Sequence, residues 1–267
     1  MDNMKFRTII ERLSRGRVFR RKIVTGQGLV TIFVSPDAQL KYMRIGNDAF
    51  DADLIRIADR VVQDGDVVWD IGANIGVFSA SCCVKANVSV LAIEADSWLS
   101  GIIRRTISLP EYTQRDVRVL TAAISNTDGA SDFLIAQRGR ASNALASAGG
   151  RSQMGGTREV MLVPTLTIDT IAKSLGPPSF IKIDIEGAEL GALQGGRETF
   201  LNTRPILYVE IGPLMFNECL NLMDGCQYKC FNANGEETND KYQSNYFFIP
   251  NENSEARDRL SRLITTS

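Results

Sequence analysis

The hydrophobic pattern of this 267-residue chain alternates between two kinds of segment. Short apolar runs that are rich in β-branched residues and bounded by turn residues predict strands, whereas apolar residues spaced three and four apart predict helices. The predicted strands span 30–34, 40–45, 67–71, 89–93, 117–124, 130–136, 159–163, 180–183, 206–211, 227–231 and 245–249. The predicted helices span 4–22, 51–62, 77–85, 98–107, 168–174, 187–194 and 214–223.

A strand followed by a helix, repeated from residue 67 onward, predicts an α/β fold. We expect a doubly wound, mostly parallel, seven-stranded Rossmann-like sheet whose last strand is antiparallel, because the turn dipeptide Asn234-Gly235 indicates a closing hairpin. A strand pair within 23–45 and a hairpin insertion at about 126–163 are added to it. The predicted parts of the chain are a basic N-terminal helix at 1–22, a single domain at 23–250 and a polar, frayed C-terminal tail at 251–267.

The most informative stretch is Val67–Ser79, in which a buried strand leads into the sequence Asp-Ile-Gly-Ala-Asn-Ile-Gly. Asp70 ends the strand, and Gly72 and Gly76 indicate a tight turn before a helix. Gly72 is expected to leave room for a ligand against the main chain, and Gly76 to let the helix pack close to the strand. We expect Asp70 to accept hydrogen bonds at the strand end rather than to lie buried in a core.

This turn does not match the phosphate-binding loops. No Lys-Ser or Lys-Thr follows the glycines, and Asn74 occupies the place of the middle glycine in G-x-G-x-x-G. An acid at the strand end would repel a diphosphate and attract the ammonium group of a cofactor that carries an amino acid. The motif D-x-G-x-N-x-G therefore looks like the first motif of class I S-adenosylmethionine methyltransferases, and a glycine turn in some other α/β domain is the alternative.

Acidic residues also end or follow other predicted strands. Glu94 lies 24 residues after Asp70, one βαβ unit further on, where an acid can accept both hydroxyl groups of an adenosine ribose. A helix-capping or solvated acid is the alternative for Glu94. Asp184, Glu186 and Glu210 belong to later strand ends. Because ligands of such sheets bind outside the carboxyl ends of the strands, we expect these acids to map to that edge.

Composition narrows the chemistry. Apolar residues make up 44% and charged residues 23%, as in ordinary globular proteins, and a net charge of −1 gives no sign of nucleic-acid binding. The absence of histidine excludes Ser-His-Asp or Cys-His catalysis and His-ligated metals. The five cysteines do not predict a disulfide framework. We find neither an apolar leader nor an apolar run of about 20 residues, so a reducing cytoplasm is the expected location.

Two segments, residues 4–22 and residues 138–157, stand out by their amino-acid composition. Residues 4–22 combine apolar residues at helical spacing with a basic face, and we expect a solvated helix, with contact to an anionic membrane surface as the alternative. Segment 138–157 is rich in Gly, Ser, Ala and Arg, which is typical of a mobile loop. Either this loop covers the site, where Arg138, Arg140 and Arg151 would meet an anionic substrate, or it has no role.

Taken together, the chain resembles the FkbM-type family of S-adenosylmethionine-dependent methyltransferases. The segments that carry the resemblance are Asp70–Gly76, Glu94, Thr165–Asp169, Lys182–Glu189, Pro205–Glu210 and Asn245–Pro250. The resemblance implies methyl transfer, usually to a hydroxyl oxygen on a sugar, glycan, polyketide or other natural product. The chain departs from many relatives in having no histidine after the strand that Glu210 ends.

The expected site has a cofactor part and an acceptor part. The residues expected to bind S-adenosylmethionine are Asp70, Gly72, Ala73, Asn74, Gly76, Glu94, Ala95 and Ala123. Asp184 or Glu186 would orient or deprotonate the acceptor hydroxyl, and Lys182 would tune that acid. Two alternatives stay open for Asp184, which could instead cap the following helix or hold a divalent cation with Glu210. The alternative function is a non-catalytic S-adenosylmethionine-binding or scaffold protein, and the pattern names neither the acceptor nor the oligomeric state.

Overall fold

The computed structural model describes residues 15–137, 139–146 and 156–264. The strands are β1 (Phe19–Thr25), β2 (Gly28–Val34), β3 (Val67–Ile71), β4 (Ser89–Ile93), β5 (Asp116–Leu120), β6 (Ala123–Ile124), β7 (Gly129–Ala136), β8 (Ala144–Leu145), β9 (Thr157–Leu166), β10 (Phe180–Ile183), β11 (Ile206–Glu210), β12 (Tyr228–Asn232) and β13 (Asn245–Pro250). The α-helices are α2 (Ala52–Arg60), α3 (Val77–Cys82), α4 (Ser97–Ile107), α5 (Ile168–Leu175), α6 (Glu189–Gln194), α7 (Arg197–Asn202), α8 (Phe216–Gly225) and α9 (Ser254–Ile264).

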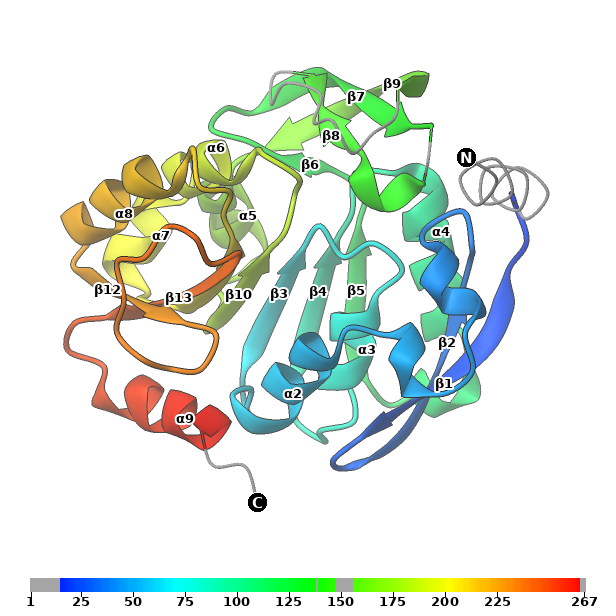
Figure 1. Ribbon diagram of the computed structural model, residues 1–267, viewed down its shortest axis with the longest axis horizontal. Coiled ribbons are helices and arrows are strands. Elements are labelled where there is room, and N and C mark those ends of the chain that lie inside the picture. The colour runs from blue at the N-terminus through cyan, green and yellow to red at the C-terminus, as the bar shows by residue number, and fades with distance from the viewer. Residues whose placement is uncertain (1–14, 138, 147–155, 265–267) are drawn as a thin grey trace.

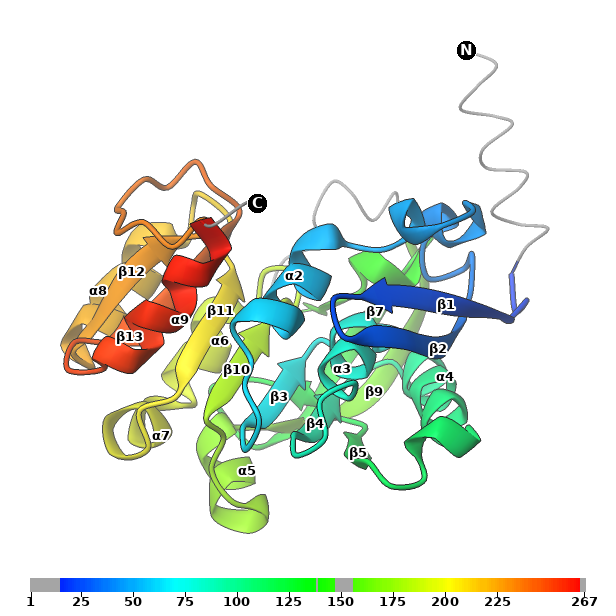
Figure 2. The same cartoon turned by 90° about the horizontal axis from the view of Figure 1, so that it is seen from below.

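The centre of the molecule is a seven-stranded sheet in the order β12-β13-β11-β10-β3-β4-β5. Neighbouring strands from β11 to β5 run parallel, whereas β13 runs antiparallel to both β11 and β12. Helices α2 and α3 lie on one side of this sheet and α5 and α7 on the other (Figure 1, Figure 2). The predicted fold class, with its antiparallel last strand, is confirmed.

Both faces of the sheet are buried, which explains the unbroken apolar runs of the central strands. Consecutive side chains of β3 point to opposite faces. Val68 belongs to the core that contains Phe78 of α3, whereas Trp69 and Ile71 belong to the core that contains Leu193 of α6. The strands therefore hold their carboxyl ends rigidly between two packed layers.

The predicted N-terminal elements were partly wrong. Residues 19–22, expected in a helix, belong to β1, and β1 pairs with β2 across a two-residue turn. Residues 40–43 form a short 3₁₀ helix instead of the second strand of the predicted pair. The short turn closes the β1–β2 pair with little loss of chain entropy. The first part of the predicted N-terminal helix, residues 4–14, lies outside the described residues.

The C-terminal segment forms a helix, where a frayed tail was predicted. Ala256, Leu260 and Leu263 of α9 are buried. Arg259 on the same helix contacts Asp66, with 3.0 Å between Nη1 and Oδ2. The helix therefore buries an apolar face although most of its residues are polar. The ion pair between Arg259 and Asp66 attaches it to the turn before β3.

The insertion forms a four-stranded sheet in the order β6-β9-β7-β8. Strands β7 and β9 pair antiparallel, as the predicted hairpin requires. The expected strand 117–124 is divided, because its end, β6, leaves the central sheet and pairs with β9 instead. The insertion lies at the end of the sheet where β3 and β4 terminate (Figure 1).

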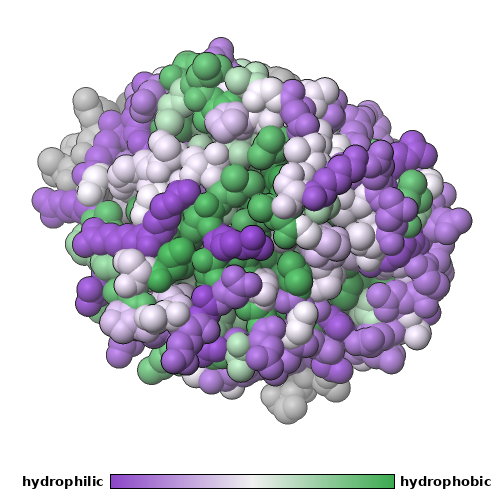
Figure 3. All heavy atoms as spheres, turned by 180° about the vertical axis from the view of Figure 1, so that it is seen from behind, coloured by the Kyte–Doolittle hydropathy of each residue, from purple (hydrophilic) through white to green (hydrophobic). Residues whose placement is uncertain are grey.

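Hydrophobic residues also reach the surface. Seen from behind, they gather in a band across the middle of the face, bordered by hydrophilic residues (Figure 3). Val160 and Leu162 of β9 are 55% and 75% exposed. Within the described ranges, no helix has both the length and the apolar character needed to cross a bilayer.

Candidate active site

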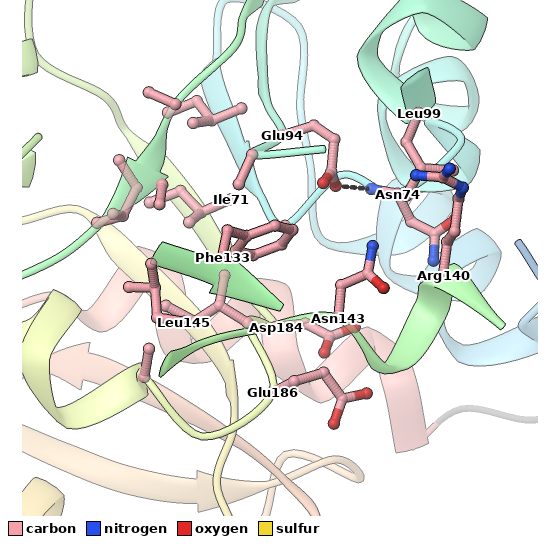
Figure 4. Close-up of a pocket in the computed structure, with 18 of the residues that line it drawn as sticks. Ile71, Asn74, Glu94, Leu99, Phe133, Arg140, Asn143, Leu145, Asp184 and Glu186 are labelled. Atoms are coloured by element: carbon pink, nitrogen blue, oxygen red, sulfur yellow. Dashed lines mark hydrogen bonds between the residues drawn. The ribbon is translucent and has the colours of Figure 1, made fainter. Parts of the chain in front are cut away.

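A pocket opens between the carboxyl ends of the parallel strands and the insertion, with about 580 Å³ of space between its walls when the adjoining open solvent is included. Its lining residues are Ile71, Gly72, Asn74, Ile93, Glu94, Ala95, Leu99, Ala122, Ala123, Ile124, Phe133, Arg140, Ala141, Asn143, Leu145, Asp184, Ile185, Glu186 and Ala188. Figure 4 shows the carboxylates of Glu94, Asp184 and Glu186 around it, with Phe133 and Leu145 forming an apolar wall.

Glu94 is held at the tip of β4 by two backbone donors. Asn74 N–H donates to Oε2 at 2.7 Å, and Asp96 N–H donates to Oε1 at 2.8 Å. Burial raises the pKa of Glu94 to about 8, and the nearby charge of Asp96 adds to the rise, although the two N–H donors oppose it. Asp96, not Glu94, caps α4, because its side chain accepts from Trp98 N–H and Leu99 N–H. The capping alternative for Glu94 is therefore wrong.

Asp70 is buried, contrary to the expectation. Its side chain is fully enclosed, and Oδ2 accepts hydrogen bonds from the backbone N–H and the hydroxyl of Ser79, at 3.1 and 2.7 Å. The carboxylate supports the turn from beneath and does not line the pocket. Burial is tolerated because Lys182 Nζ lies 3.3 Å from Oδ1.

Gly72 lines the pocket, but the place that a Cβ atom on it would take is occupied by the chain itself. A Cβ atom on Gly72 would lie 1.9 Å from the carbonyl oxygen of Asp184, and its φ angle is +72°. Gly76 differs, because a Cβ atom added to it would lie in ordinary contact with Ile103 of α4, at 3.4 Å, and it is the φ angle of +82° that favours glycine there. Gly72 thus allows the first motif to approach the Asp184 loop, and Gly76 allows the left-handed turn into α3.

Lys182 connects the two acidic strand ends. Its Nζ donates to the carbonyl of Gly72 at 2.8 Å and lies 3.3 Å from Asp70 and 3.6 Å from Asp184. Burial lowers the pKa of Lys182, but the charges of Asp70 and Asp184 outweigh it, so that the pKa is raised. Lys182 therefore remains an ammonium ion at neutral pH and serves as a fixed positive charge.

The loop after β10 presents two acids to the pocket. Asp184 and Glu186 both line the pocket, and Glu186 has a φ angle of +55°. Buried Glu189 shapes this loop, because its Oε1 accepts from Ile185 N–H at 3.3 Å and Gly187 N–H at 3.0 Å. The N-cap of α6 is Ala188, so the alternative that Asp184 caps this helix is wrong.

The insertion supplies a wall of the pocket through Arg140, Ala141, Asn143 and Leu145. The guanidinium of Arg140 contacts Asp37 and Asp96. Because two carboxylates already neutralise it, the expected role of Arg140 with an anionic substrate has no support here. Arg138 and Arg151 lie outside the described residues.

The structure brings most of the predicted cofactor residues together. Those that line the pocket are Gly72, Asn74, Glu94, Ala95 and Ala123. Asp70, Ala73 and Gly76 do not line it. Glu210 does not line the pocket with Asp184, and among the described residues no three His, Cys, Asp or Glu side chains form a metal-binding group.

The family of the chain follows from its sequence match. The family model of the FkbM methyltransferase domain matches residues 70–230, from the first acidic strand end to the last hairpin. The chain belongs to this family.

Several known proteins are similar to this FkbM-family chain. The hexuronic acid methyltransferase AglP of Haloferax volcanii is 27% identical over 145 residues, which are 54% of this chain. The chain spans about half the length of this curated relative, namely 55%. The structure of a methyltransferase FkbM from Methylobacillus flagellatus KT is 20% identical with a TM-score of 0.46, and the match covers 70% of this chain and 44% of that one. A SAM-dependent methyltransferase of Agrobacterium tumefaciens is 9% identical with a TM-score of 0.46, covering 87% and 70%.

Sequence reasoning missed part of the wall of this FkbM domain. Leu99, Phe133, Asn143 and Leu145 line the pocket but belong to no predicted site. The apolar members are indistinguishable in sequence from core residues. Asn143 stands in a run of small residues, and only its hydrogen bonds to β7 and to Asp96 reveal its place.

Proposed function

We propose that this FkbM-family chain is an S-adenosylmethionine-dependent methyltransferase that methylates a hydroxyl oxygen of a sugar or glycan. The observation that carries the proposal is the shared pocket of Glu94, at the tip of β4, and Asp184 and Glu186, after β10. One side of the pocket suits a nucleoside, and the other suits a hydroxyl group that must be oriented.

The residues present fit S-adenosylmethionine. Asn74 Oδ1 is buried without a hydrogen-bond partner and belongs to a pocket-lining residue, so it suits a donor from a ligand. The Glu94 carboxylate is placed to accept from the ribose hydroxyls, and Leu99 and Phe133 offer apolar surface for an adenine ring. S-adenosylmethionine would supply an electrophilic methyl group on a sulfonium. Asp70 and Lys182 would act indirectly, by fixing the turn.

The acceptor would be held by the acids of the opposite wall. Asp184 and Glu186 can accept a hydrogen bond from a sugar hydroxyl and take its proton as the oxygen becomes methylated. The ammonium of Lys182, 3.6 Å from Asp184 Oδ2, would help to hold that carboxylate in position. Positioning contributes much of the rate when the electrophile is already reactive. A relative named for a hexuronic acid acceptor supports a sugar as the substrate class.

Titration calorimetry with S-adenosylmethionine tests the cofactor half of the proposal. We expect binding by the wild type and a loss of about tenfold or more in affinity for Glu94→Gln, because an amide cannot accept from both Asn74 and Asp96 N–H. Glu218→Gln, an exposed acid on α8, is the matched control and should bind as the wild type does. No heat of binding by ligand-free wild type at millimolar cofactor would refute the proposal.

Transfer of a labelled methyl group to hexuronic acids, neutral hexoses and glycans tests the acceptor half. We expect a methyl ether on a hydroxyl, and a fall in kcat for Asp184→Asn with little change in cofactor affinity. Binding without transfer to any acceptor would favour the non-catalytic alternative. Inhibition by a chelator would reopen the metal alternative for Asp184.

A further inference from the structure

Four charged side chains of alternating sign lie beside the pocket. Asp96, fully buried, contacts the guanidinium of Arg140. Arg140 Nε lies 3.3 Å from Asp37 Oδ2, and Arg158 Nη1 lies 2.9 Å from Asp37 Oδ1. The order Asp96–Arg140–Asp37–Arg158 connects the β4–α4 turn, the insertion and the segment after β2. Each charge has a neighbour of opposite sign, which offsets part of the free-energy cost of burying it.

Backbone and amide hydrogen bonds also join the insertion to the segment after β2 and to Asp96. Arg140 N–H donates to the carbonyl of Asp37 at 2.8 Å, and Ala141 N–H donates to the next carbonyl along at 3.2 Å. Asn143 Nδ2 donates to Asp96 Oδ2 at 2.9 Å. Arg140, Ala141 and Asn143 line the pocket, whereas Asp37 does not. Asp37 therefore holds the wall from outside.

We propose that Asp37 is a positioning residue that holds the wall 140–145 against the cofactor pocket through Arg140. The inference rests on the proposed function, because it concerns the affinity of that same site. Asp37 precedes the region 70–230 that the family model matches. A segment of this chain outside the matched region would thereby complete a pocket that the family motifs begin.

Removing Asp37 has a definite expected effect. Arg140 keeps Asp96 and its backbone hydrogen bond to the Asp37 carbonyl, but its guanidinium loses its second carboxylate and is then held by one acid instead of two. The guanidinium of Arg140 also lies over the ring of Trp98, 4.8 Å from its centroid, so the environment of this indole reports the wall. Trp69, the second tryptophan, is 1% exposed and should not respond. We expect the Kd for S-adenosylmethionine to rise about tenfold, because Arg140, Ala141 and Asn143 line the pocket and would be held less firmly.

The test compares Asp37→Asn with Arg158→Gln. Arg158→Gln removes the other partner of Asp37 and leaves the Asp37–Arg140 contact in place. For Asp37→Asn we expect the tenfold rise in Kd by calorimetry, faster hydrogen exchange at the amides of residues 140 and 141, and stronger acrylamide quenching of Trp98. For Arg158→Gln we expect changes of less than about twofold in all three. Arg140→Gln should reproduce the effects of Asp37→Asn, and combining the two should add nothing further.

Three results would overturn the inference. One is an unchanged Kd in folded Asp37→Asn, and another is an equal rise in Arg158→Gln. The third is an absence of binding by the wild type, which refutes the proposed function as well. That case is distinguished because exchange and quenching would still separate the two variants if Asp37 holds the wall without serving a cofactor.

Discussion

The close approach of Gly72 to the Asp184 loop makes Gly72→Ala the most informative substitution. An added Cβ would lie 1.9 Å from the carbonyl oxygen of Asp184 and 2.8 Å from its carbonyl carbon. Real Cβ contacts are essentially never shorter than 3.0 Å, so the two backbones must separate by at least the difference, 1.1 Å. The hydrogen bond from Asp184 N–H to the carbonyl oxygen of Ile71, now 3.1 Å long, would be strained by that movement.

The loss of folding free energy expected for Gly72→Ala has two parts. An alanine at φ +72° costs about 1–2 kcal/mol in left-handed backbone, and a forced shift in a packed interior costs about 1–3 kcal/mol more. We therefore expect Gly72→Ala to lower the free energy of unfolding by about 2–5 kcal/mol. Gly65→Ala is the matched control, because Gly65 has φ +90° but no atom within 4 Å of the place a Cβ would take. It should lose about 1–2 kcal/mol, the conformational part alone.

Urea unfolding of both variants, followed by circular dichroism, measures this difference. The wild type and the variants should unfold with the same dependence on urea, so that the midpoints compare directly. Equal losses for Gly72→Ala and Gly65→Ala would refute the reasoning, because they would mean that the Asp184 loop does not press on the turn. A folded Gly72→Ala should also bind S-adenosylmethionine more weakly, since the two walls of the pocket would be forced apart.

Three further predictions concern charge and helix propensity. Below pH 8 the ligand-free Glu94 holds a proton, and this proton must leave before the carboxylate can accept from the ribose hydroxyls. The affinity for S-adenosylmethionine should therefore rise by up to about tenfold per pH unit toward pH 8 and then level off. Calorimetry across pH 6–9 measures this, and a flat profile would contradict it. For the same reason, Glu94 favours the folded ligand-free protein below pH 4.5, and this contribution is lost as the pH rises through about 8. Lys182→Met should cost about 3–5 kcal/mol by leaving Asp70 buried without its counter-charge, whereas exposed Lys229→Met should cost less than about 1 kcal/mol in the same denaturation assay; similar losses would argue against a buried pair. Gly101→Ala, in the exposed middle of α4 with open space where a Cβ would be added, should raise stability by about 0.5–1 kcal/mol, and a loss would show that this position is constrained.

The first motif could be predicted because its signals are local. A buried apolar strand, a glycine turn and a helix are each dictated by neighbours in sequence, and Asp70 and Glu94 appear at the ends of β3 and β4 as expected. Pairing of β3 with β4 then follows from the parallel crossover, which places both strand ends on one edge. The pocket position of Glu94 could therefore be predicted from its spacing in the sequence alone.

The environment of Asp70 could not be predicted in this way. Whether a carboxylate at a strand end faces a ligand or the interior depends on whether a counter-charge reaches it. That charge comes from Lys182, more than a hundred residues later, on the neighbouring strand β10. Sheet order, and not sequence distance, brings the two together.

The sequence by itself determined the strand–helix alternation, the glycine turn and the acids at the strand ends, because periodicity and turn chemistry act over a few residues. Tertiary structure alone decided the docking of α9 through Arg259 and the attachment of the insertion through Asp37 and Arg140. Each of these depends on partners that the local pattern does not specify. Their free energy comes from burial and charge pairing that exist only once the sheet has assembled.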